Sequence, residues 1–74
     1  MKAREILSKI MKKYRKENGL SQEKFAELSG LSVDTISLIE CEKISPRFET
    51  VYKILTAMGV DLEQLLLDEI EKKK

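Results

Sequence analysis

The chain has 74 residues and a formal net charge of +1, with 42% hydrophobic and 36% charged side chains, one cysteine and no histidine. This balance is typical of one soluble globular domain and excludes a largely disordered chain. A single cysteine excludes an internal disulfide, and the lack of histidine removes the commonest metal ligand and general base. No apolar run approaches the roughly 18 residues of a membrane span, and the charged start MKAREILSK argues against a signal peptide. We therefore expect a cytoplasmic protein that needs no cofactor or metal and is not an enzyme.

Charge is distributed unevenly along the chain. Residues 1–24 carry eight basic and three acidic side chains, whereas residues 25–71 carry three basic and ten acidic ones. A basic segment of this kind suits a polyanionic partner. The alternative is that its lysines and arginine only solvate the outer face of a helix, as Lys12, Lys13, Arg15 and Lys16 would.

Apolar residues recur at helical spacing in five segments, and no stretch alternates with the period of two that a strand requires. The pattern predicts an all-α domain. The expected helices cover residues 3–17, 22–29, 33–40 and 46–58, and a fifth begins at Asp61.

Strong boundary signals mark these helices. Ser21, Ser32 and Asp61 each follow an apolar residue and precede another one four positions later, as a helix cap with a hydrophobic staple does. Asp61 and Gln64 have the spacing of a capping box. Ser45-Pro46 places a capping residue before a proline at the first helical position.

The second and third helices are too short to be stable alone and need a shared core. Glu71 to Lys74 is expected to be a frayed basic tail, which leaves one domain over residues 1–70. The expected core members come from all five helices and the connections between them: Ile10, Leu20, Phe25, Leu28, Ile36, Ile39, Phe48, Val51, Leu55, Leu62 and Leu66.

Ser29-Gly30-Leu31 is a three-residue turn between the two short helices. Two helices joined in this way form a helix-turn-helix unit. Glycine at the centre can adopt a positive φ, and the small Ala26 would let the two helices approach closely. An ordinary helical hairpin is the alternative interpretation of the turn alone.

These features resemble the lambda-repressor-like, Cro-type helix-turn-helix domain of phage repressors and bacterial regulators. In that family five helices form the domain and the third enters the DNA major groove. The resemblance implies a sequence-specific regulator of transcription, of bacterial or phage origin, that binds double-stranded DNA as a homodimer and represses by occlusion. The matching residues are 19–32, Thr35-Ile36-Ser37, Ile39-Glu40, Pro46 and 58–62.

The resemblance also implies roles for individual residues. Arg15 and Glu40 match a partly buried ion pair that ties the first helix to the end of the third. Gln22 matches a glutamine that binds a phosphate and braces the third helix. The full set of implied phosphate contacts is Gln22, Thr35, Lys43 and Arg47.

The third helix departs from the family at the positions that face the bases. Family members often carry Arg, Gln, Asn or Ser at these outward positions, which in this chain are Val33, Asp34, Ser37 and Leu38. Val33 and Leu38 offer only apolar contact, for instance with thymine methyl groups, and Asp34 could accept from a cytosine amino group. The alternative function is a helix-turn-helix module that binds a regulatory protein partner, as an anti-repressor or antitoxin does.

A second departure is Cys41-Glu42, where the family usually has Asn-Gly. Glu42 either adopts a left-handed backbone at a cost of about 1 kcal/mol or the turn is rearranged. We expect Cys41 to be a small, half-buried apolar side chain and not a redox sensor.

The last helix has more apolar surface than one core face needs. Leu62, Leu65 and Leu66 would face the core, whereas Leu67 and Ile70 lie towards another side. We expect Leu67 and Ile70, with Met58, to contribute to a homodimer contact. The alternative is a longer core that reaches Ile6 and Leu7.

Overall fold

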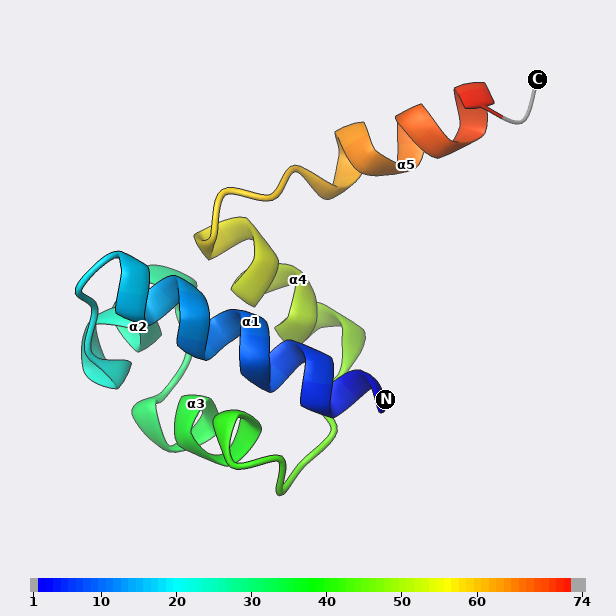
Figure 1. Ribbon diagram of the computed structural model, residues 1–74. Helices are drawn as coiled ribbons and strands as arrows, with labels where there is room; N and C mark the ends of the chain where they lie inside the picture. Colours follow the sequence, from blue (N-terminus) through cyan, green and yellow to red (C-terminus); the bar gives the residue numbers. More distant parts are fainter. Residues whose placement is uncertain (1, 73–74) are drawn as a thin grey trace.

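The computed structural model describes residues 2–72, which contain five helices and no strand (Figure 1). The expected all-α class is thereby confirmed. The helices are α1 (Ala3–Glu17), α2 (Gln22–Ser29), α3 (Val33–Glu40), α4 (Phe48–Ala57) and α5 (Leu62–Lys72). Helix α3 packs on α1 and α2, α2 also packs on α4, and α5 contacts α4. No helix within residues 2–72 has both the length and the apolar character to cross a bilayer.

The predicted N-terminal caps are present at three helices. Ser21 Oγ accepts from the backbone N–H of Lys24 at 3.0 Å, and Ser32 Oγ accepts from that of Thr35 at 3.1 Å. Asp61 Oδ1 accepts from the N–H of Gln64 at 3.0 Å. The Gln64 side chain, however, donates to Asp68 at 2.9 Å. The capping box at Asp61 is therefore only half formed.

Helix α4 begins later than the sequence suggested. We expected Ser45 to cap a helix that starts at Pro46, but the first helical residue is Phe48 and Arg47 occupies the cap position without a side-chain hydrogen bond. Arg47 is extended, with φ −72° and ψ 160°. Ile44, in the connection that precedes α4, packs against the core.

The first four helices end in the same way. In each, a residue with positive φ is followed by one whose backbone N–H donates to the carbonyl five positions earlier, which is the Schellman motif. Three of these residues are glycines, and the fourth is Glu42 with φ 61°. Glu42 thus takes the left-handed conformation, and the turn after α3 is not rearranged.

The core lies between α1, α2, α3 and α4. Its buried apolar members are Leu7, Met11, Phe25, Ala26, Ile36, Ile39 and Ile54. Three expected core members are wrong: Ile10, Leu28 and Phe48 are 40%, 52% and 74% exposed. The buried row of α1 follows Leu7 and Met11, one position away from the row of Ile10. Leu28 lies outside the narrow stripe of α2 that faces its neighbours, and Phe48 begins α4 beyond the stripe centred on Ile54.

Helix α5 extends away from the four-helix body (Figure 1). The principal extents are 42 × 23 × 21 Å and the radius of gyration is 13.1 Å, above the roughly 11 Å of a compact chain of this length. Leu62 is half-buried, while Leu67 and Ile70 are 53% and 58% exposed. The helix includes Glu71 and Lys72, which were expected in the tail. The side chains of Leu65 and Leu66 lie outside the described residues.

Candidate nucleic-acid interface

The turn between α2 and α3 is held by short-range hydrogen bonds. Gly30 adopts φ 72°, and the N–H of Leu31 donates to the carbonyl of Ala26 at 3.0 Å. Ser29 Oγ is buried and donates to the carbonyls of Phe25 and Ala26. Ala26 is buried where α2 packs on α3. Two short helices in contact across a three-residue turn with glycine at its centre form a helix-turn-helix unit.

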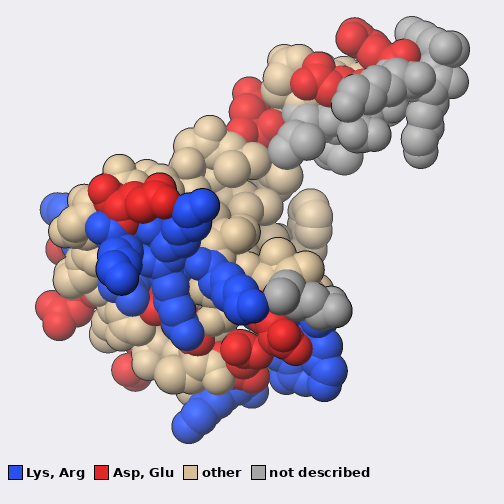
Figure 2. All heavy atoms as spheres, in the orientation of Figure 1, with Lys and Arg blue, Asp and Glu red and all other residues tan. Residues whose placement is uncertain are grey.

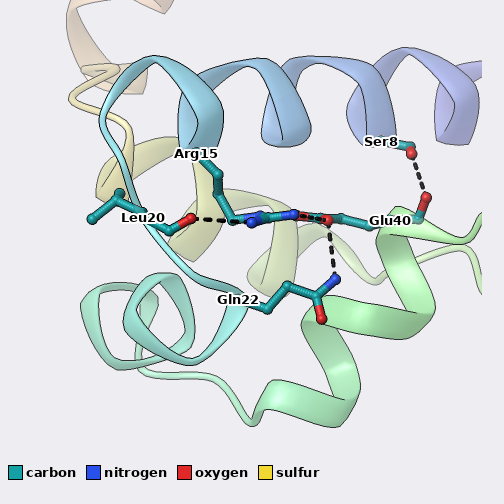
Figure 3. A network of polar contacts seen from close by, with 5 residues as sticks. All are labelled: Ser8, Arg15, Leu20, Gln22 and Glu40. Carbon is teal, nitrogen blue, oxygen red and sulfur yellow. Dashed lines mark hydrogen bonds and ion pairs between the residues drawn. The ribbon is translucent and has the colours of Figure 1, made fainter.

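A polar network holds the C-terminal end of α3 (Figure 3). Arg15 of α1 makes two parallel contacts with the Glu40 carboxylate, at 2.7 Å from Nε and 2.6 Å from Nη2. Gln22 of α2 donates from Nε2 to Glu40 Oε1 at 3.1 Å. The hydroxyl of Ser8 donates to the Glu40 backbone carbonyl at 2.6 Å. Residues from α1 and α2 thus converge on one residue of α3, and Glu40 is only 2% exposed.

The protonation states of this network follow from its geometry. Burial raises the pKa of Glu40, but the hydrogen bonds from Arg15 and Gln22 and the Arg15 charge outweigh it, so that its pKa lies below the ordinary value. The hydrogen bond to Glu40 raises the pKa of Arg15. Both groups are therefore charged at neutral pH. The guanidinium also donates to the Leu20 carbonyl at 3.1 Å, which ties in the connection between α1 and α2.

Gln22 has a further hydrogen-bonding capacity. A glutamine amide carries two N–H donors, and only one is directed at Glu40 in this network. Because the carboxylate accepts from the nitrogen, the amide has a defined orientation. Gln22 is also the first residue of α2, where helix N–H groups and the helix dipole favour an anion.

The opposite side of α3 is open to solvent. Val33, Asp34 and Leu38 are exposed, and Ser37 is half-buried. Thr35 is half-buried, and its hydroxyl shares a 2.8 Å hydrogen bond with that of Ser32. All four residues expected to face the bases therefore lie on α3.

The loop that follows α3 carries exposed charges of both signs. Lys43 and Arg47 are exposed, as are Glu42 and Cys41. The expectation that Cys41 is half-buried is therefore wrong, because the C-cap position of α3 points its side chain to solvent. Lys43 and Arg47 flank the loop as expected, with Glu42 beside Lys43.

Basic side chains gather on one face of the molecule, over α1, while acidic ones lie along α5 (Figure 2). The exposed lysines of α1 are Lys9, Lys12, Lys13 and Lys16. Basic side chains gathered on α1, which packs on α3, would attract a polyanion and raise its rate of association. Among the described residues, no group of three His, Cys, Asp or Glu side chains is arranged to hold a metal ion.

Ser8 is the residue of this site that the sequence reasoning missed. It precedes Arg15 by seven positions, so that both lie on the same face of α1. The sequence did hold one sign of this contact. Ser8 is a small hydroxyl residue on an otherwise apolar helix face, and it shares that face with the arginine expected to pair with Glu40.

Several known proteins have sequences similar to this chain. The helix-turn-helix family matches residues 11–65. The HTH-type transcriptional regulator PuuR of Escherichia coli (strain K12) is 43% identical over 56 residues, which cover 76% of this chain and 30% of that protein. The PuuR regulator of Shigella flexneri gives the same values.

A third relative is nearer to this chain in length. Control protein C.SmaI of Serratia marcescens is 33% identical over 66 residues, 89% of this chain and 79% of that protein. No solved structure matches the chain. Because the family covers most of residues 1–74, and α2 and α3 meet across the turn at Gly30, this chain belongs to the helix-turn-helix family.

Proposed function

We propose that this chain is a sequence-specific, double-stranded DNA-binding regulator of transcription and not an enzyme. One observation carries the proposal: the Glu40 network holds α3 from within, while Val33, Asp34 and Leu38 on its other side are exposed. A helix that enters a DNA groove must be held firmly on its inner side and be exposed on its outer side. The relatives are a transcriptional regulator and a control protein, which supports the same function.

In this proposal the DNA backbone is held at four positions. The second N–H of Gln22, oriented by Glu40, donates to a phosphate at the start of α2. Thr35 donates from its hydroxyl near the start of α3, and Lys43 and Arg47 contact phosphates from the loop. These contacts set the register of α3 without reading sequence.

Base recognition would fall to Val33, Asp34, Ser37 and Leu38. The two apolar side chains suit thymine methyl groups, Asp34 suits a cytosine amino group, and Ser37 can pair with several base edges. Because Asp34 is repelled by phosphates, recognition depends on how precisely the backbone contacts place it.

The mechanism we propose is repression by occlusion in the cytoplasm, by a homodimer without a cofactor. Two copies related by a two-fold axis would present their α3 helices to half-sites one DNA turn apart. Leu67 and Ile70 are exposed on α5 and are our candidates for the contact between the copies.

Selection from a random duplex library at physiological salt, followed by sequencing of the bound pool, tests this function. We expect an enriched motif with two-fold symmetry. Affinity for that motif should fall steeply with rising salt, because phosphate contacts release counterions. A pool that stays random while the protein is folded would contradict the proposal.

A second candidate is a module that binds a regulatory protein, favoured by the exposed Val33 and Leu38 on α3. An apolar protein contact tolerates salt, whereas phosphate anchoring does not. If a bound partner is found whose affinity is insensitive to salt and is lost in the variant Leu38→Glu, this second function holds instead.

A further inference from the structure

A hollow of about 190 Å³ opens between the first turns of α1, the connection that precedes α4, and α4 itself. The first turn of α1 lies beside that connection and the beginning of α4 (Figure 1). Three segments of the chain thus meet around one hollow. Its lining residues are Ala3, Arg4, Leu7, Ser45, Pro46 and Val51.

The walls of this hollow are mostly apolar and are fixed by the core. Leu7 is a buried core member, and the half-buried Val51 packs against the core. Pro46 in the connection is half-buried as well. Because these residues are held by the fold, the hollow is present before a ligand arrives. Sites for small molecules are typically concave, mostly apolar and preformed in this way.

Arg4 is the single charged side chain that lines the hollow among the described residues. It is half-buried, and none of the ion pairs found within residues 2–72 involves it. A guanidinium can bind a carboxylate through two parallel hydrogen bonds. The hydroxyl of Ser45, which also lines the hollow, is a further donor. The polar groups of this site therefore suit a negatively charged ligand.

Three other surface hollows of the described chain do not share this charge. One on α1 and α4 contains Glu17, one at the junction of α4 and α5 contains Asp61, and one on α4 contains Glu49. A carboxylate in the lining would repel an anion. The hollow at Arg4 differs from these three because its only charge is positive.

The volume of the hollow limits the size of its occupant. A dry apolar cavity of about 150 Å³ in a protein can hold one benzene molecule. Sites for drug-sized ligands begin at about 300 Å³. A volume near 190 Å³ therefore suits a ligand slightly larger than benzene, with roughly eight to ten non-hydrogen atoms.

We propose that this hollow binds a small organic anion, whose apolar body packs against Leu7 and Val51 and whose carboxylate pairs with Arg4. The site needs neither DNA nor a second copy of the chain, so it goes beyond the proposed function. The connection that forms one wall of the site also carries the two loop residues proposed to contact phosphates.

Benzoate, benzyl alcohol and benzylamine are matched probes of this site, because they share one ring and differ in charge. Each is titrated into isotope-labelled protein without DNA while the chemical shifts of the backbone amides are recorded. We expect benzoate to shift the amides of Leu7, Ser45 and Val51 and to saturate, with a dissociation constant on the order of 1 mM.

The order of the three affinities tests the charge of the site. Benzoate should bind about fivefold more tightly than benzyl alcohol, since a partly exposed ion pair contributes that much, and benzylamine should bind most weakly. Equal affinities for the three probes would overturn the proposal. Benzoate shifts that do not saturate, or that centre on another part of the chain, would overturn it as well.

Arg4→Gln separates charge from shape. The variant should bind benzoate about fivefold more weakly, as weakly as benzyl alcohol, and its affinity for benzyl alcohol should not change. Lys9→Gln is the matched control, since Lys9 is an exposed basic residue of α1 that does not line the hollow, and should change neither affinity. If benzoate binding is unchanged in Arg4→Gln, or falls equally in Lys9→Gln, the proposed pairing is wrong.

Ala3→Leu fills the hollow with the protein's own side chain. Ala3 is exposed, so the larger residue should leave the core and the helix content unchanged while benzoate and benzyl alcohol both lose their binding. Lys2→Leu adds the same side chain outside the lining and should bind both probes normally. Unaltered benzoate binding in Ala3→Leu would overturn the site.

The site and the proposed function can fail separately. A protein that selects a DNA motif but binds no benzoate overturns the site and leaves the function standing. A protein that binds benzoate at Arg4 but selects no motif overturns the function and leaves the site standing. If benzoate does not bind and Arg4→Gln weakens DNA binding, Arg4 contacts a phosphate and the site for a small anion is overturned.

Discussion

The two sides of α3 differ in burial, polarity and connection to the rest of the chain. On the inner side, Glu40 is 2% exposed and its carboxylate and carbonyl receive hydrogen bonds from α1 and α2. On the outer side, Val33 and Leu38 are 38% and 40% exposed. In the function proposed above, one helix would thus separate stability from recognition. Substitutions on the inner side should unfold the domain, and those on the outer side should change only what it binds.

Arg15→Ala should have the largest effect on stability. It leaves the Glu40 carboxylate buried without its bidentate partner and the Leu20 carbonyl without a donor. Loss of one partner from a buried pair costs about 3 kcal/mol or more. We expect the free energy of unfolding, measured by urea denaturation, to fall by that amount.

Lys13→Ala is the control for Arg15→Ala. Lys13 and Glu17 also form an ion pair on α1, at 3.9 Å, but their side chains are 75% and 60% exposed. Exposed pairs contribute about 0.5 kcal/mol or less. Similar losses in the two variants would mean that burial does not distinguish the inner side of α3.

The same network should make stability depend on pH. The pKa of Glu40 lies below its ordinary value of 4.5 because hydrogen bonds from Arg15 and Gln22 outweigh the effect of burial. A carboxylate of this kind stabilises the fold above its ordinary pKa, and that contribution is lost as pH falls through its folded-state pKa. Arg15 stays charged throughout.

Glu40→Gln isolates this contribution. We expect the unfolding free energies of the unaltered protein and of the variant to differ most at neutral pH and to converge in acid. A difference that is constant from neutral to acidic pH would show that the Glu40 charge is not coupled to folding.

Gln22→Ala should weaken DNA binding about tenfold, to a similar extent for every sequence, since a phosphate contact contributes without reading bases. The variant also loses one hydrogen bond to Glu40, which costs about 1 kcal/mol of stability, so binding must be measured where the protein is fully folded. Glu23→Ala, at the next and exposed position, is the control. A loss confined to one DNA sequence would place Gln22 at a base.

Glu42→Gly should stabilise the protein by about 1 kcal/mol, because glycine adopts φ 61° without the steric cost that glutamate bears. Gly59→Ala should do the reverse. Nothing lies within 4 Å of the Cβ that alanine would add at Gly59, so backbone strain alone would act. Thermal unfolding measures both, and changes of equal sign would refute the interpretation.

Local chemistry explains what could be predicted from the sequence. The bounds of α1, α2 and α3 depend on caps and end residues within a few positions, such as Ser21 and Gly30, and these were predicted correctly. The exposure of Phe48 depends on the residue at which α4 begins and on the direction in which α5 runs. Both depend on how the chain packs in three dimensions, which the local sequence pattern does not contain.

Some contacts of the candidate site were likewise expected before the structure, and others were not. The pairing of Arg15 with Glu40 was expected from resemblance to a family, because residues 25 positions apart in sequence carry no local sign of contact. The contact of Ser8 with the Glu40 carbonyl was missed, since a backbone acceptor leaves no trace in the pattern of side chains.

Leu38→Ala should have the smallest effect. The side chain is 40% exposed on the outer side of α3, so its truncation should change the unfolding free energy by less than about 0.5 kcal/mol. If Leu38 contacts a thymine methyl group, the variant should lose its preference at one base pair. Its affinity should fall only about threefold, because the contact buries little apolar surface.

Selection of the DNA motif bound by Leu38→Ala, beside that bound by the unaltered protein, measures this preference position by position. One position should become degenerate while the rest of the motif persists. An unchanged motif would remove Leu38 from recognition, whereas a large loss of stability would mean that the outer side of α3 is not free of the core. Either result would mean that the inner and outer sides of α3 do not divide stability and recognition between them.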